Sequence, residues 1–179
     1  SRDPKERQEV AIVRPEEDNG LRAMNLQPQL FHNEQHGTTS DDYYTPPEVF
    51  ETLGLEFDLD VCSPPGGIHW IPTRTFYTQA DDGLLSDWHG RVWLNPPYSS
   101  PQQWIEKFIA HGDGVALVQV SKARWFNRLW ASSVPMVLNR ADFKFIATDG
   151  TYKGVFMPTW FIALGDECVE ALGRLGHVR

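Results

Sequence analysis

The 179-residue sequence has few cysteines, no long apolar run and more acidic than basic residues. Its two cysteines, Cys62 and Cys168, lie far apart without metal-ligand spacing, so the default is a pair of reduced thiols. No apolar stretch reaches the length of about 20 residues that a membrane helix needs, and residues 1–19 are too polar for a secretory signal. The sequence therefore predicts a globular, cytoplasmic protein with no metal site and no membrane segment.

The formal net charge of −8 is unevenly distributed along the chain. Residues 1–60 hold 5 Lys and Arg against 14 Asp and Glu, whereas residues 115–160 hold 6 against 2. A nucleic-acid binder neutralises phosphates with a basic surface. The overall negative charge therefore argues against simple DNA binding, whereas the basic segment 115–160 favours it. Lys122, Arg124 and Arg128 are the candidate phosphate contacts. For any one of them alone, a solvated surface is the commoner explanation.

The most distinctive segment is Asn95-Pro96-Pro97-Tyr98, which follows the short apolar run 92–94. Proline fixes its own φ and pushes the preceding residue toward extended geometry, so the proline pair fixes the direction of the nearby carbonyls. The Asn95 side-chain oxygen and the Pro96 carbonyl can then accept hydrogen bonds from an exocyclic amino group. Tyr98 is placed to stack on the ring. A stiff turn is the alternative for a bare proline pair.

Alternating apolar runs and helical patterns predict an α/β fold, a three-layer sheet with an antiparallel edge. We expect strands at 57–61, 92–94, 115–120, 136–138 and 159–164, and helices at 45–54, 100–112 and 124–131. Two capping boxes are predicted to begin the first two helices, at Thr45 and Ser100. A late hairpin is expected around Asp149-Gly150. Residues 1–40 are expected to form a polar arm or linker, with one short strand at 8–13.

Four segments, taken in order, resemble the S-adenosylmethionine-dependent DNA methyltransferases that modify amino groups, above all the short phage-type adenine-N6 enzymes. They are Asp41-Asp42-Tyr43-Tyr44-Thr45-Pro46-Pro47-Glu48-Val49-Phe50, Phe57-Asp58-Leu59-Asp60-Val61-Cys62-Ser63, Asp81-Asp82-Gly83-Leu84-Leu85-Ser86-Asp87-Trp88 and Asn95-Pro96-Pro97-Tyr98. The resemblance runs from about Asp41 to Leu164. It implies a Rossmann-like methyltransferase sheet with a late antiparallel hairpin in a domain of residues 41–179, S-adenosylmethionine as cofactor, and adenine N6 of DNA as target.

The resemblance also implies which residues carry the chemistry. Asn95, Pro96, Pro97 and Tyr98 are assigned to catalysis, and Tyr44, Thr45, Pro46, Asp60, Cys62 and Asp82 to cofactor binding. From the residues alone, Asp60 is the best-placed carboxylate, because ligands of α/β sheets bind at the carboxyl ends of strands. The usual glycine-rich turn after this strand is absent, and residues 60–67 replace it.

Two alternatives remain open from the sequence. An amino-methyltransferase of the same fold acting on cytosine N4, RNA adenine or a protein glutamine amide fits the overall acidity better. A non-enzymatic subunit with a methyltransferase fold is the other, and the intact Asn95-Pro96-Pro97-Tyr98 argues against it. Because no additional base-reading domain is evident, target specificity is relaxed, carried by residues 122–156 or supplied by a protein partner.

Overall fold

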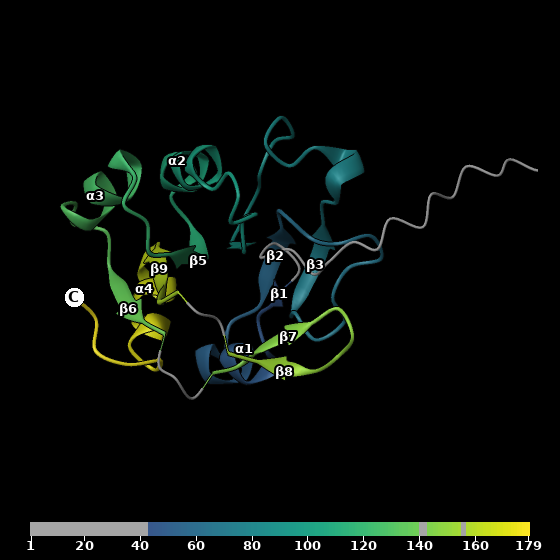
Figure 1. Ribbon diagram of the computed structural model, residues 1–179. Helices are drawn as coiled ribbons and strands as arrows, with labels where there is room; N and C mark the ends of the chain where they lie inside the picture. Colours follow the sequence, from purple (N-terminus) through teal and green to yellow (C-terminus); the bar gives the residue numbers. More distant parts are fainter. Residues whose placement is uncertain (1–42, 140–142, 155–156) are drawn as a thin grey trace, which may run out of the picture. The chain divides into compact units, whose positions relative to one another are not determined.

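The computed structural model describes residues 43–139, 143–154 and 157–179 (Figure 1). A mixed six-stranded sheet in the order β3-β2-β4-β5-β9-β6 forms its centre. The strands are β2 (Phe57–Asp60), β3 (Thr73–Phe76), β4 (Val92–Leu94), β5 (Gly114–Gln119), β6 (Met136–Leu138) and β9 (Thr159–Leu164). Strands β2, β3, β4 and β5 run parallel, whereas β9 is antiparallel to both β5 and β6. The expected antiparallel edge is therefore made by β9 and β6.

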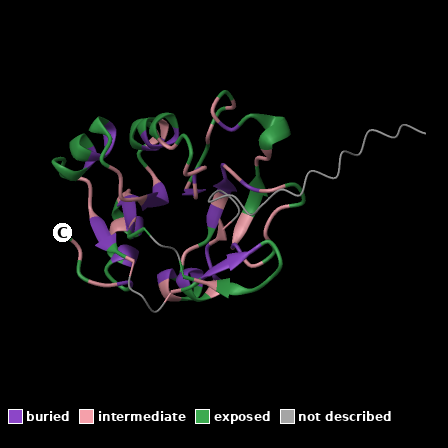
Figure 2. Ribbon diagram, viewed as in Figure 1, coloured by how far each residue is buried: buried purple, intermediate pink, exposed green. Residues whose placement is uncertain are grey.

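Helices cover both faces of this sheet. They are α1 (Pro47–Leu53), α2 (Gln102–His111), α3 (Arg124–Trp130) and α4 (Asp166–Leu172). Strand β5 shows the two faces directly, because Val115 and Leu117 pack with α1 and α4 while Ala116 and Val118 pack with α2 and α3. Figure 2 shows the middle of the sheet buried between helices whose outer sides are exposed, whereas most of β3, at one end of the strand order, is exposed. A continuous apolar strand is typical of a sheet covered on both faces, and the predicted three-layer α/β fold is confirmed.

A second, three-stranded sheet contains β1 (Tyr43–Tyr44), β7 (Phe145–Ala147) and β8 (Tyr152–Lys153), in the order β1-β7-β8. Strands β7 and β8 form the predicted hairpin, with Gly150 at φ 79° in the turn. This hairpin does not extend the main sheet. It pairs instead with β1, where Tyr43 lies opposite Ala147. The hairpin thus holds the segment that leads into α1.

Helix α1 begins one residue later than predicted, at Pro47, and has no side-chain capping bond. Pro46 precedes another proline, which keeps its ψ at 156°, an extended value, so it cannot be the first helical residue. Thr45 is therefore too far from the helix to cap it. Helix α2 likewise begins after Pro101 without a side-chain cap. Gly54, at φ 62°, ends α1 in the left-handed conformation, as predicted.

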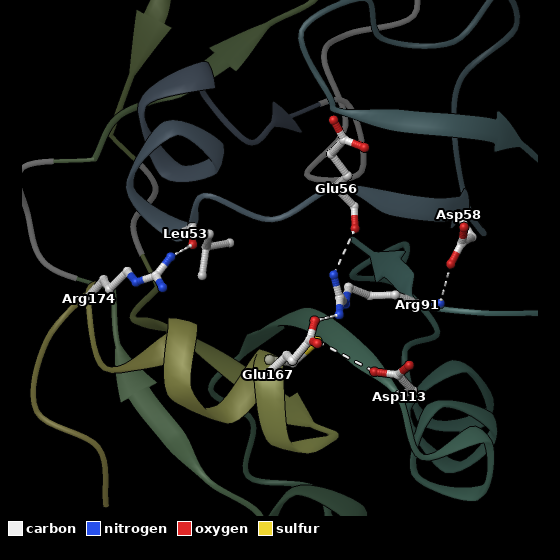
Figure 3. A network of polar contacts seen from close by, with 8 residues as sticks. Leu53, Glu56, Asp58, Arg91, Asp113, Glu167 and Arg174 are labelled. Carbon is white, nitrogen blue, oxygen red and sulfur yellow. Dashed lines mark hydrogen bonds and ion pairs between the residues drawn. The ribbon is translucent and has the colours of Figure 1, made fainter.

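Side chains join the amino ends of β2 and β4 to α4 (Figure 3). Asp60 and Asn95 lie at the opposite ends of these two strands. Arg91, directly before β4, pairs through Nη2 with Glu167 of α4, and its Nη1 donates to the Glu56 carbonyl oxygen at 3.3 Å. The Arg91 backbone N–H donates to Asp58 Oδ2 at 2.9 Å. One end of β4 is thus fixed by this network.

The predicted N-terminal arm at 1–40, with its strand at 8–13, lies outside the described residues, as do residues 155–156 of the predicted hairpin strand. Within residues 43–139, 143–154 and 157–179, no helix has both the length and the apolar character needed to span a membrane.

Candidate active site

Two cavities open where β2 and β4 end. The first, of about 240 Å³, lies between the end of β2, the segment after β4, and β1. The second, of about 570 Å³, lies between the end of β2, the short 3-10 helix η1 (Gln79–Asp81) and α2. Cys62, Ser63, Gln79 and Pro97 line both cavities. We therefore treat them as one cleft, at the edge of the sheet where ligands of α/β proteins bind.

Asn95 lines the first cavity of this cleft. Its Nδ2 donates to the Tyr43 carbonyl oxygen at 3.0 Å, which fixes the orientation of the amide. Its Oδ1 is buried and accepts no hydrogen bond from any described residue. Because a buried acceptor without a donor is costly, this oxygen is suited to accept an N–H from a ligand.

Two hydroxyl groups share this property. Thr45 is 1% exposed and Ser63 is 7% exposed, both line the first cavity, and neither hydroxyl has a hydrogen-bond partner among the described residues. Thr45 is held in place by Trp70, whose Nε1 donates to the Thr45 carbonyl oxygen at 2.9 Å. Three unsatisfied polar atoms around one cavity indicate a site for a polar ligand.

Asp60 adds a carboxylate to the first cavity. The side chain is almost fully buried, at 2% exposed, and its Oδ1 accepts the Cys62 backbone N–H at 3.2 Å. Burial raises the pKa of Asp60 to about 6, and the Cys62 amide opposes only part of that rise. The Ser63 side chain also lowers this pKa, although its hydroxyl lacks good hydrogen-bond geometry toward the carboxyl. A cationic ligand group would stabilise the ionised form of Asp60.

Asp82 and Gly83 form one wall of the second cavity. Asp82 has φ 48°, a left-handed conformation that non-glycine residues seldom adopt. A Cβ at Gly83 would lie 2.2 Å from the Val61 carbonyl oxygen, so the turn lies directly against the end of β2. Trp104 of α2 forms another wall. The second cavity thus combines a carboxylate with an aromatic surface.

The structure gathers most of the residues that the sequence nominated. Those that line the cleft are Tyr44, Thr45, Asp60, Cys62, Asp82, Asn95 and Pro97. Pro46 and Pro96 are buried and line neither cavity. Tyr98 also lines neither, and its ring packs against the hydrophobic cluster below α1 and α4. Its stacking on a base remains a prediction.

The nominated basic residues lie apart from the cleft. Lys122 and Arg124 are exposed after the end of β5, and Arg128 borders a third cavity, of about 260 Å³, between α2 and α3. Trp125 and Phe126, which lie between Arg124 and Arg128 in the sequence, are 8% and 5% exposed. They face the core because α3 uses this side to cover the sheet.

Sequence reasoning missed Ser63, Gln79 and Gly83 as residues of the cleft. One signal was available for Gln79, since Thr78 and Asp81 form a capping box around it. Ser63 and Gly83 lie within two of the four segments that carry the family resemblance, and that was the signal available for them. Among the described residues, no group of three or more His, Cys, Asp or Glu is placed to hold a metal ion.

The sequence model of one protein family, described as DNA N-6-adenine-methyltransferase (Dam), matches residues 33–151. A curated relative, the DNA N-6-adenine-methyltransferase of Haemophilus phage HP1 (strain HP1c1), is 35% identical over 75 residues. The alignment covers 39% of this chain and 42% of the relative, so the chain spans less than half the length of the curated relative that it matches. No solved structure matches the chain significantly.

Proposed function

The chain belongs to the DNA N-6-adenine-methyltransferase (Dam) family, and from this premise we propose that it methylates adenine N6 in DNA with S-adenosylmethionine as methyl donor. The observation that carries the proposal is the buried Oδ1 of Asn95, a residue that lines the cleft, because this oxygen accepts no hydrogen bond from the described residues. This oxygen is a hydrogen-bond acceptor without a donor, and it suits a reaction in which an amino group is held by such an acceptor.

The chemistry explains why Asn95 is needed. The exocyclic nitrogen of adenine is a weak nucleophile because its lone pair is delocalised into the ring. An N–H donated to Asn95 Oδ1 draws the nitrogen toward tetrahedral geometry and localises that pair. The predicted second acceptor, the Pro96 carbonyl, belongs to a buried residue that lines neither cavity. Because Tyr43 already holds Asn95 Nδ2 at 3.0 Å, the acceptor is oriented before substrate arrives, which is electrostatic preorganisation.

The cleft also has the groups that S-adenosylmethionine requires. The Asp60 carboxylate suits its ammonium group, and the Thr45 and Ser63 hydroxyls can donate to its carboxylate. Asp82 and Trp104, in the second cavity, suit the ribose and adenine. When bound, the cofactor supplies an activated methyl group, while the protein supplies orientation.

DNA would approach from the same edge of the sheet. The parallel strands β4 and β5 end side by side, so Lys122 and Arg124 follow β5 at the edge where Asn95 follows β4. Both are exposed and can contact phosphates. The target adenine has to leave the duplex to reach a buried acceptor, as bases do in other base-modifying enzymes.

The test is a methylation assay with S-adenosylmethionine labelled on the methyl group. The protein is incubated separately with DNA, RNA and protein, and the labelled nucleoside or residue is identified after digestion. We expect N6-methyladenine in DNA. If the label is found in N4-methylcytosine, in RNA or in a glutamine amide, adenine N6 of DNA is not the target and the labelled group is. Cofactor binding without any label transfer would favour the non-enzymatic subunit.

A further inference from the structure

Lys107, on α2, directs its ammonium group at the turn that follows η1. Its Nζ donates to the carbonyl oxygens of Gly83 at 3.1 Å, Leu84 at 2.9 Å and Ser86 at 2.5 Å. An ammonium group has three N–H donors and no acceptor, so these three carbonyls use its full donor capacity. The same Nζ lies 4.9 Å from the centroid of the Trp88 ring, within the range of a cation–π contact.

The turn that Lys107 contacts needs external support. The backbone N–H groups of Leu85 and Ser86 donate to the Asp82 carbonyl oxygen at 3.0 and 2.9 Å, which forms a single helix-like turn. The carbonyls at the end of such a turn lack partners within it and carry partial negative charge. Asp82 itself is held at φ 48°, a conformation that persists only when its surroundings impose it.

Trp88 links the same turn to the wall of the second cavity. Its Nε1 donates to the Gly83 carbonyl oxygen at 2.7 Å, beside the bond from Lys107. Its ring stacks on Trp104, with centroids 6.4 Å apart and planes inclined by 24°. Lys107 and Trp88 therefore support the turn through its carbonyl groups, while Gly83 lies against both the Val61 carbonyl and the Trp104 ring.

We propose that Lys107 is a positioning residue for cofactor binding, which holds Asp82 and Gly83 in place as the wall of the second cavity. Lys107 lines neither cavity, so it acts through the turn and does not touch the ligand. The half-buried ammonium is committed to three carbonyls and an aromatic ring. This inference rests on the proposed function of the cleft.

The experiment compares Lys107→Met and Lys107→Arg with the wild type by calorimetric titration with S-adenosylmethionine. Methionine keeps the apolar stem but removes the charge and the N–H donors, so we expect cofactor affinity to fall by about tenfold or more. Displacement of a supporting group by about 1 Å can cost on the order of 10²-fold. Lys107→Arg keeps the charge and should bind with intermediate affinity. Methylthioadenosine, which lacks the amino-acid end, should lose affinity by the same factor as the cofactor.

Two further measurements separate positioning from a general structural role. Steady-state assays should show a raised KM for the cofactor with kcat at saturation within about twofold of the wild type, because bound cofactor restores the turn. Glu106→Gln, which keeps the side-chain acceptor for Gln102 on the same helix, should match the wild type. Equal weakening in Glu106→Gln would overturn the role of Lys107.

The outcomes distinguish this inference from the proposed function. If the wild type binds the cofactor and Lys107→Met binds it equally well, the positioning role is wrong and the proposed function stands. If the wild type does not bind the cofactor, both are wrong. Should Lys107→Met fail to fold, Trp88→Phe replaces it, since it removes the Nε1 donor to Gly83 and keeps a smaller aromatic ring beside Lys107 and Trp104. Cofactor affinity unchanged by Trp88→Phe would then contradict the inference.

Discussion

The side-chain amide of Asn95 has one end hydrogen-bonded within the fold and the other end without a donor among the described residues. The nitrogen is bonded to the Tyr43 carbonyl, and the oxygen has no donor among the described residues. Asn139 has the same pattern elsewhere, since its Nδ2 donates to Thr159 Oγ1 at 2.9 Å and its Oδ1 is also buried and unsatisfied within the described chain. A comparison of variants at Asn95 and Asn139 can therefore show whether an effect on activity comes from the buried, unsatisfied amide oxygen itself or from its place in the cleft.

Asn95→Ala should reduce methyl transfer by at least roughly 10²–10³-fold, the usual effect of removing one transition-state acceptor. Cofactor affinity should change little, because the proposed role of Asn95 is to hold the amino group of the target. Steady-state turnover and calorimetric titration measure the two effects. Asn139→Ala is the matched control and should turn over normally. Near-normal turnover by Asn95→Ala would contradict the assigned role.

Asp60 makes stability depend on pH. Folding raises the pKa of Asp60 from 3.8 to about 6, because burial disfavours the ionised carboxylate. The folded state is therefore most stable, as far as Asp60 is concerned, below about pH 4, and it loses this stability as the pH rises through 6. At pH 8 the buried carboxylate costs roughly 2–3 kcal/mol. Asp60→Asn should recover most of this at pH 8 and little at pH 4, as measured by urea unfolding. An equal effect at both pH values would show that burial does not perturb Asp60.

The same variant should bind S-adenosylmethionine more weakly, because an amide cannot balance the charge of its ammonium group. For the wild type, cofactor affinity should fall as pH drops below 6, by up to about tenfold per pH unit, as the carboxylate takes up a proton. Asp60→Asn should lose this pH dependence. Calorimetric titration between pH 5 and pH 8 tests both statements. Unchanged affinity in Asp60→Asn would place the ammonium group elsewhere, with Asp82 the next candidate.

At the scale of elements, α3 turns one side to the sheet and the other to solvent. Trp125, Phe126 and Leu129 are buried, whereas Arg124 and Arg128, four residues apart, are exposed. Side chains at this spacing lie on the same side of a helix. The exposed side of α3 is thus a basic surface that leads away from the end of β5.

The double variant Arg124→Ala, Arg128→Ala should weaken DNA binding without changing cofactor affinity. Each lost phosphate contact should lower the slope of log K against log salt by about 0.9. Arg74→Ala is a suitable control, because Arg74 is exposed on β3, at the other end of the strand order. If the slope is the same in the double variant, DNA contacts another surface.

The sequence predicted the elements with strong local patterns and missed those defined by distant partners. The apolar run of β5 and the helix at 124–130 follow from side-chain periodicity alone. The place of β9 between β5 and β6 depends on pairing between residues 40–50 apart for β5 and 22–26 apart for β6, which no local pattern encodes. Asp60, Thr45 and Asn95 came from motifs. Lys107 did not, because its partners lie more than 20 residues earlier in the chain.

At the scale of the whole molecule, the two ends of the parallel strands differ: the carboxyl ends line the cleft, and the amino ends are joined to helices by side-chain contacts. The cleft lies at the carboxyl ends of β2 and β4, and the Arg91 network joins the amino ends of these strands to α4. Because contacts at the amino ends of the strands stabilise the sheet, the residues at the carboxyl ends are available to bind ligands. In addition, Arg174 donates to the Leu53 carbonyl, which ties the segment after α4 to the end of α1.

Arg91→Met should therefore lower the free energy of unfolding by about 1–3 kcal/mol, because it leaves the Glu56 carbonyl and Glu167 without their donor. The kcat of the folded enzyme should stay close to the wild-type value. Urea unfolding and turnover at low temperature measure the two effects. Glu167→Gln is the control, and because Glu167 is mostly exposed its loss should be under about 1 kcal/mol. A large fall in kcat with normal stability would assign Arg91 to the reaction.

Only the three residues of β4, Val92–Leu94, separate Arg91 from Asn95, and all three are at most 1% exposed. A strand this short spans about 10 Å and has no exposed residue at which it could open locally. Its amide protons should exchange with solvent only when the whole sheet unfolds. On heating, the loss of activity should therefore coincide with unfolding. No lower temperature should exist at which the fold persists while Asn95 has left its position.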